Sequence, residues 1–164
     1  MPPYAGPVLL TGEHFTTSFD SGKPSLDAWL QRRALGNQRP GASRTWVVCS
    51  DGPEVVAFYA SAVASILRGA ATGRAARSQP EEIPAILLAR LAVDRKHQRH
   101  RLGQALLKHF IEKALEASEI VGVRLLLVHA LDDEAAGFYR HFGFDASPID
   151  ERTLMVPISD LRTG

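Results

Sequence analysis

The sequence has a single cysteine and no long hydrophobic run, and both absences limit what the protein can be. Cys49 alone cannot form an internal disulfide bond, and a cysteine-rich zinc site is excluded as well. No apolar run reaches the roughly 18 residues that a membrane-spanning helix needs. Residues 1–7 lack the basic and then apolar order of a signal peptide. We therefore expect a cytoplasmic protein that does not enter a membrane.

The remaining composition is that of a globular domain. The chain has 164 residues, of which 45% are hydrophobic and 23% are charged. One hydrophobic core typically serves about 100 to 200 residues. The sequence shows no repeat and no linker, so we predict a single domain over residues 1–164.

Charge is distributed unevenly along the chain, although the formal net charge is only +1. Residues 1–110 contain 14 Lys and Arg against 8 Asp and Glu, whereas residues 111–164 contain 5 against 10. A basic surface of this kind suits a phosphate-rich partner, but a solvated mixed surface is the commoner explanation. The candidate RNA contacts are Arg32, Arg33, Arg39, Arg44, Arg74, Arg77 and Arg90.

Hydrophobic periodicity predicts an α/β fold in which strands and helices alternate. The first half is expected to contain a short strand at 7–10, a helix capped by Ser25, and a hairpin of strands 45–49 and 55–60. Residues 67–84 fit neither periodicity and are expected to form a surface loop. The second half is expected to contain a central buried strand at 85–93, a long helix at 102–115, a parallel strand at 124–130, a helix at 132–142 and a closing edge strand at 153–158 with Pro157.

The junction between the central strand and the long helix is a candidate anion site. Amide groups at a helix N-terminus have no helical partner and bind phosphate well, and Gly103 permits close approach to the backbone. Four basic residues surround the junction: Arg95, Lys96, Arg99 and Arg101. A solvated basic turn is an equally good interpretation from composition alone.

Two segments resemble a known family. Residues 91–94 read Leu-Ala-Val-Asp, and residues 98–105 read Gln-Arg-His-Arg-Leu-Gly-Gln-Ala. Together they resemble the acetyl-CoA signature Q/R-x-x-G-x-G/A of the GCN5-related N-acetyltransferases (GNAT). Residues 132–144 resemble a later segment of the same family, which ends in F-Y-x-x-x-G-F. Two motifs in the expected order are far more specific than either alone.

This resemblance implies the GNAT fold, with a single mixed central sheet, flanking helices and two central parallel strands that splay apart at the cofactor cleft. It implies acetyl-CoA as co-substrate and no metal. Backbone groups of Leu91, Ala92 and Val93 would bind the pantetheine and polarise the thioester oxygen. The pyrophosphate would bind to the turn formed by Gln98, Arg99, His100, Arg101, Leu102, Gly103 and Gln104.

Tyr139 matches the tyrosine that donates a proton to the departing thiolate of coenzyme A in this family. Without the resemblance, a tyrosine beside Phe138 and Phe142 would more often be part of the core. Two positions depart from the family pattern: Arg101 replaces the first glycine of the signature, and Asp132 replaces a frequent asparagine. If position 101 has a positive φ, an arginine there costs about 1 kcal/mol or more. Alternatively, its side chain reaches the cofactor phosphates.

The resemblance extends to one branch of the family, the acetyltransferase toxins of bacterial toxin–antitoxin modules. Its further motifs are residues 25–30, 41–45 and 119–124. Members of this branch acetylate the amine of aminoacyl-tRNA and block translation. The implied partners are aminoacyl-tRNA, a small DNA-binding antitoxin and a second copy of the chain in a homodimer.

Acid–base arithmetic tests the choice of acceptor that the resemblance implies. An α-amine with a pKa near 7.7 to 8.0 is roughly 10 to 20% neutral at pH 7, whereas a lysine amine is only ~0.04% neutral. An α-amine therefore needs little help from a general base, and the candidates His97, His100, His129 and Glu134 are more simply surface or core residues. We reject a metal site at His97 and His100, because basic residues surround the pair. Cys49 lies in a β-run and is expected to be buried.

Two other classes of function remain open from sequence. A GNAT enzyme of a protein N-terminus or a small amine would transfer acetyl groups but leave tRNA unmodified. A non-catalytic acetyl-CoA sensor or RNA-binding module would bind its ligand without any transfer.

Overall fold

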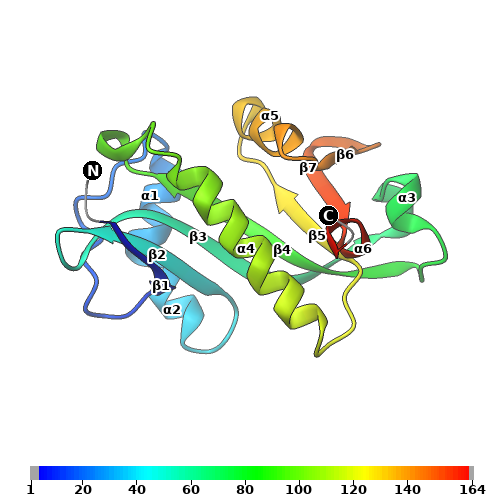
Figure 1. Ribbon diagram of the computed structural model, residues 1–164, viewed down its shortest axis with the longest axis horizontal. Helices are drawn as coiled ribbons and strands as arrows, with labels where there is room; N and C mark the ends of the chain where they lie inside the picture. The colour runs from blue at the N-terminus through cyan, green and yellow to red at the C-terminus, as the bar shows by residue number, and fades with distance from the viewer. Residues whose placement is uncertain (1–3, 163–164) are drawn as a thin grey trace. The chain divides into compact units, whose positions relative to one another are not determined.

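The structure is a computed structural model that describes residues 4–162 (Figure 1). Residues 1–3 and 163–164, which the single-domain prediction includes, lie outside the described residues. The first three also belong to the segment interpreted as lacking a signal-peptide pattern. Within the described residues, no helix has both the length and the hydrophobicity needed to cross a bilayer.

Seven strands form a mixed sheet in the order β1-β2-β3-β4-β5-β7-β6. The strands are β1 (Tyr4–Leu9), β2 (Arg44–Ser50), β3 (Glu54–Leu67), β4 (Glu82–Val93), β5 (Leu125–His129), β6 (Asp145–Ser147) and β7 (Asp150–Pro157). β4 and β5 pair in parallel, and the pairs β1–β2, β2–β3, β5–β7 and β6–β7 are antiparallel. The predicted mixed sheet with a parallel central pair is confirmed.

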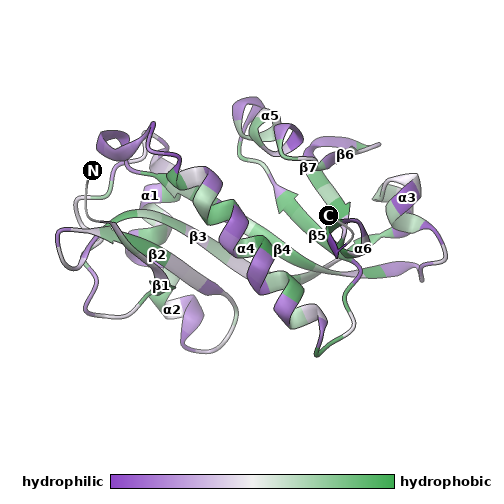
Figure 2. Ribbon diagram, viewed as in Figure 1, coloured by the Kyte–Doolittle hydropathy of each residue, from purple (hydrophilic) through white to green (hydrophobic). Residues whose placement is uncertain are grey.

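The helices are α1 (Pro24–Arg32), α2 (Ala34–Gln38), α3 (Gly73–Ala76), α4 (Leu102–Ser118), α5 (Asp133–His141) and α6 (Ile158–Arg162), with 3-10 turns η1 (Arg68–Ala70) and η2 (Arg95–His97). Hydrophobic and hydrophilic residues occupy different faces of α4 (Figure 2). Its buried residues follow helical spacing: Leu102, Leu106, Leu107, Phe110 and Ala114. The long helix predicted from this spacing is confirmed.

Residues 4–162 divide into two units. The first contains the described residues up to Ser61 together with Arg90–Phe110, and the second contains Ala62–Ala89 together with the described residues from Ile111 onward. The prediction of a single domain stays a prediction.

The first unit buries the inner faces of β2 and β3 under α1. Phe58 in β3 is fully buried, Trp29 of α1 stacks on its ring at 6.1 Å, and Phe19 meets it edge-on at 5.5 Å. The predicted hairpin is confirmed, although β3 is longer than expected. Ser25 is not the N-cap of α1, because the helix begins at Pro24, whose fixed φ suits a first helical position.

The second unit is built around the parallel pair. Residues Ala85–Leu88 pair with Leu125–Val128. One face of this pair packs in a core cluster that includes Ile83 and Met155. At the start of α5, the carboxylate of Asp132 accepts a hydrogen bond from the amide of Ala135 at 2.9 Å, as expected of an N-cap.

Two sequence predictions about the second unit are wrong. The expected loop at 67–84 contains η1, α3 and the start of β4, since Thr72 caps a single helical turn through the amide of Ala75. β7 is not an edge strand, because β6 pairs with it on one side and β5 on the other. Pro157 is tolerated there because β6 begins opposite Met155, so Pro157 lies beyond the end of β6.

Candidate functional site

The turn between β4 and α4, where the sequence predicts an anion site, leads into the N-terminus of a long helix. The amide of Ala105 donates to the carbonyl of Arg101 at 3.0 Å, which is the first bond of the α4 ladder. The amides of residues 102–104 come before this bond, at the positive end of the helix dipole. Such an N-terminus is suited to phosphate.

The backbone of this turn is left-handed at two arginines. Arg99 has a φ of 73° and Arg101 a φ of 60°. In this region an L-residue other than glycine costs about 1 to 2 kcal/mol. Position 101 therefore has the positive φ at which the sequence predicts a cost for arginine. Arg101, which stands where the resembled signature has its first glycine, thus adopts a conformation that favours glycine, and the residue is exposed.

The basic residues of the turn differ in their partners. Arg95 forms an exposed ion pair with Asp20, with 3.2 Å between Nε and Oδ1. Lys96, Arg99 and Arg101 are exposed. Three exposed basic residues therefore precede the N-terminus of α4, and their positive charge favours an anion at this turn.

The end of β4 lies next to this turn. Pairing with β5 ends at Leu88 and Val128, whereas β4 continues to Val93. The backbone of Leu91–Val93 thus extends beyond the parallel pair, as the predicted splay requires. Leu91 and Val93 are half-buried, and Ala92 is 6% exposed and packs in the core cluster of the first unit.

Other members of the predicted cofactor set have different environments. Leu102 is buried, Gly103 is half-buried, and His100 and Gln104 are exposed. The side-chain amide of Gln98 is already occupied, because its Nε2 donates to the carbonyl of Val93 at 3.1 Å and to that of Ser21 at 3.4 Å. Gln98 therefore organises the turn through its side-chain Nε2, and its side-chain oxygen and backbone groups remain for a ligand.

Tyr139 lies in the second unit, on α5, and its residue is 5% exposed. Its ring meets Phe138 and Phe144 edge-on at 5.3 and 6.0 Å. Burial raises the pKa of its hydroxyl well above the ordinary value, so the phenol keeps its proton throughout the physiological range.

The hydroxyl of Tyr139 forms no hydrogen bond within residues 4–162. It is not among the fully buried side-chain oxygens that lack a partner in that part of the chain, which belong to Ser43 and Thr45. Tyr59, a core tyrosine, behaves differently, because its hydroxyl lies 2.7 Å from Nδ1 of His109. Buried tyrosines normally find such a partner, so the Tyr139 hydroxyl is available for a ligand.

The histidines have individual partners. Nδ1 of His97 lies 2.9 Å from the Tyr4 hydroxyl, and the Tyr4 ring meets the rings of His97 and His100 edge-on. His129 lies 3.3 Å from the hydroxyl of Thr153. Glu134 is exposed in the first turn of α5. No general base is singled out by this arrangement.

The arginines predicted to contact RNA differ in their exposure and in their partners. In the first unit, Arg32, Arg33, Arg39 and Arg44 are exposed, whereas the guanidinium of Arg90 stacks over Trp29 at 4.4 Å. In the second unit, Arg77 is exposed, and Arg74 forms ion pairs with Asp145 and Asp160.

Cys49 is 5% exposed, and burial raises the pKa of its thiol. This environment disfavours the reactive thiolate, in agreement with the sequence analysis.

Sequence reasoning missed Asp94 and Asp20, whose contacts hold the start of the turn. Asp94 is 8% exposed, and it caps η2 by accepting from the amide of Lys96 at 2.9 Å. Its position, directly after a buried strand and before a run of basic residues, was the available signal for a capping role.

Known proteins similar to this chain were found by family, sequence and structure. The acetyltransferase (GNAT) domain family matches residues 41–146. A tRNA-acetylating toxin of Mycobacterium tuberculosis is 47% identical over 97% of this chain and 95% of its own length.

Solved structures of acetyltransferase toxins are also similar to this chain. AtaT complexed with acetyl-methionyl-tRNAfMet has a TM-score of 0.87 and 26% identity, covering 95% of this chain and 96% of that one. A mutant of the AtaT toxin bound to the C-terminus of the antitoxin AtaR and to acetyl-CoA has a TM-score of 0.82 and 25% identity, covering 95% and 94%.

Proposed function

Because this chain belongs to the acetyltransferase (GNAT) family, we propose that it is a toxin that transfers the acetyl group of acetyl-CoA to the α-amino group of aminoacyl-tRNA. The observation that carries the substrate assignment is the 47% identity, over nearly the whole chain, to a tRNA-acetylating toxin. Blocking the α-amine prevents that amino acid from forming a peptide bond, so translation is inhibited.

The turn between β4 and α4 fits the phosphates of acetyl-CoA. It offers the amides of residues 102–104, and Lys96, Arg99 and Arg101 are exposed basic residues of the same turn. The backbone of Leu91–Val93, beyond the end of the parallel pair, offers hydrogen-bonding groups to the pantetheine. When bound, acetyl-CoA supplies the thioester carbonyl that the amine attacks.

We assign to Tyr139 the role of stabilising the leaving thiolate. The attack forms a C–N bond and breaks the C–S bond, so negative charge develops on sulfur while the amine loses a proton to solvent. Tyr139 is protonated because burial raises its pKa, and its hydroxyl has no partner within residues 4–162. It can therefore donate a hydrogen bond, and then its proton, to the departing sulfur.

The acceptor itself explains why no strong general base is needed. An α-amine has a pKa near 7.7 to 8.0, so a tenth or more of it is neutral at pH 7. None of the candidate bases needs a catalytic role for the reaction to proceed. A lysine acceptor would demand about 3.5 kcal/mol more for deprotonation.

The partners follow from the same family assignment. A toxin of this kind requires an antitoxin, and AtaT is similar to this chain and binds the C-terminus of the antitoxin AtaR. We infer a small DNA-binding antitoxin as the partner of this chain, a homodimer as its assembly, and the cytoplasm, where charged tRNA is found, as its location. Co-purification with the antitoxin and light scattering of the free toxin test the first two.

The decisive experiment offers labelled acetyl-CoA to several acceptors. The purified protein is incubated with total aminoacyl-tRNA, deacylated tRNA, a peptide with a free N-terminus and a set of small amines. Label should enter aminoacyl-tRNA and not deacylated tRNA. Label found only in peptide or small amines would refute the substrate assignment, and binding without any transfer would refute the enzymatic one.

The Tyr139→Phe variant tests the assigned acid. It removes one hydroxyl from a buried ring and leaves the contacts with Phe138 and Phe144 intact. Turnover should fall by orders of magnitude, and growth inhibition should be relieved. Turnover comparable to that of the parent protein would show that Tyr139 is only a core residue.

A further inference from the structure

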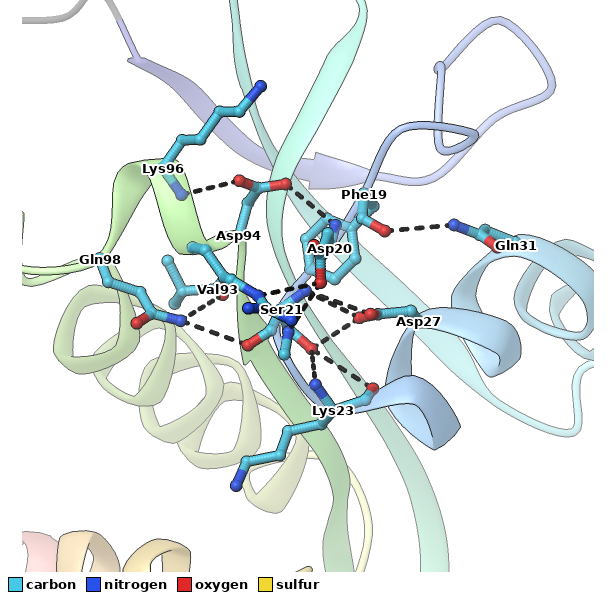
Figure 3. Close-up of polar contacts among 12 residues, drawn as sticks. Phe19, Asp20, Ser21, Lys23, Asp27, Gln31, Val93, Asp94, Lys96 and Gln98 are labelled. Carbon is cyan, nitrogen blue, oxygen red and sulfur yellow. Dashed lines mark hydrogen bonds and ion pairs between the residues drawn. The ribbon is translucent and has the colours of Figure 1, made fainter.

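A network of polar contacts connects the start of α1 to the turn that begins the candidate acetyl-CoA site (Figure 3). It joins residues 20–27 to residues 94–98, and both segments belong to the first unit. We propose that Asp94 is a positioning residue for coenzyme A binding, which, together with Asp27, fixes the conformation of this turn. The inference deepens the proposed function, since it concerns the same cofactor site.

Asp94 joins the two segments directly. One carboxylate oxygen accepts from the amide of Lys96 at 2.9 Å, and the other accepts from the amide of Asp20 at 3.0 Å. The Asp94 amide also donates to the carbonyl of Val56 in β3 at 2.8 Å. A single buried carboxylate thus anchors the end of β4, the first turn of η2 and the segment before α1.

Further contacts reinforce this connection. The amide of Arg95 donates to the carbonyl of Asp20 at 2.8 Å. The guanidinium of Arg95 also forms an ion pair with the carboxylate of Asp20. Gln98 donates to the carbonyl of Ser21 at 3.4 Å. Gly22 packs so closely that a Cβ there would lie 3.3 Å from Nε of Arg95.

Asp27 holds the other end of the network. It accepts from both the amide and the hydroxyl of Ser21, at 3.0 and 2.6 Å. Ser21 is 8% exposed, and its carbonyl is the acceptor for Gln98. Asp27 therefore acts on the turn through Ser21.

The turn needs this support because of its backbone. Arg99 and Arg101 both lie in the left-handed region, where glycine would be relaxed and arginine is strained. A conformation of this kind persists only when its surroundings fix it. The contacts of residues 94–98 supply that constraint immediately before Arg99.

Electrostatics alone predicts the opposite effect. A carboxylate close to a phosphate site weakens anion binding, so neutralising Asp94 should strengthen it. If Asp94 positions the turn, however, neutralising it should weaken binding. The Asp94→Asn substitution keeps the size of the side chain but replaces one of the two accepting oxygens with a donor, so one of its two amide partners loses its bond.

The experiment measures coenzyme A binding by calorimetry for the parent protein, Asp94→Asn, Asp27→Asn and a control. The control is Asp51→Asn, which makes the same chemical change in an exposed turn of the same unit. Kd should rise about tenfold in Asp94→Asn, several-fold in Asp27→Asn and not at all in the control. For acetyl transfer, the KM for acetyl-CoA should rise in parallel, with kcat at saturation within about twofold of the parent value.

Several results would overturn the inference. Tighter binding in Asp94→Asn would show that its charge matters and its geometry does not. In either variant, a fall in kcat with an unchanged KM for acetyl-CoA would show that the network does not position the cofactor turn. A lower melting temperature with an unchanged Kd for coenzyme A would show that the network only stabilises the fold. Loss of the fold in both variants would do the same. Because the binding measurement contains no tRNA, it remains informative even if the proposed acceptor is wrong.

Discussion

The left-handed backbone at Arg101 makes a quantitative prediction about stability. At a φ of 60°, alanine pays the steric cost of its Cβ and glycine does not. Glycine loses more backbone entropy on folding, which offsets part of the gain. We therefore expect Arg101→Gly to be more stable than Arg101→Ala by about 1 kcal/mol, or about 2 to 4 °C in melting temperature for a chain of this size.

The matched control is the same pair of substitutions at Gln104, in the first turn of α4. There the backbone is helical, so alanine should be favoured over glycine by up to about 1 kcal/mol. Thermal unfolding of the four variants measures both differences. Alanine more stable than glycine at position 101 would refute the left-handed conformation. Both variants at 101 lose the guanidinium, so an equal rise of their Kd for coenzyme A would measure its contribution to phosphate binding.

Three further predictions concern single side chains. Tyr59→Phe should lower the stability by about 1 kcal/mol, because it removes the hydrogen bond to His109, and should leave the KM for acetyl-CoA unchanged, in contrast to the loss of turnover in Tyr139→Phe. Asp132→Ala should cost about 1 kcal/mol in chemical denaturation, as expected for a lost N-cap. The kcat/KM for aminoacyl-tRNA should rise as the α-amine deprotonates near pH 8 and should not fall again below pH 10, since burial raises the pKa of Tyr139. A falling limb below pH 10 in the parent protein would contradict this.

The elements around the site were predictable because strong local patterns encode them. The spacing of apolar residues along α4 and the acidic start of α5 fix both helices. The apolar strands at 85–93 and 124–130 predict the parallel pair, which the register confirms. Boundaries were less accurate, since Pro24 rather than Ser25 begins α1.

The remaining features depend on contacts between distant parts of the chain. No local pattern shows that Asp94 bonds to the amide of Asp20, 74 residues earlier. The side chain of Gln98 belongs to the same network, which the motif alone did not show. The interior position of β7 follows from pairing with the three-residue β6, which is too short to leave a clear periodicity.

The identity of the acetylated atom tests the account most directly. After reaction with acetyl-CoA, charged tRNA is digested with ribonuclease, and the terminal adenosine is analysed by mass spectrometry. We predict an N-acetylaminoacyl adenosine whose formation depends on the hydroxyl of Tyr139. Acetyl groups found only on nucleobases would contradict this prediction. Aminoacyl adenosine that stays unmodified when the enzyme is in excess over the tRNA would contradict it as well.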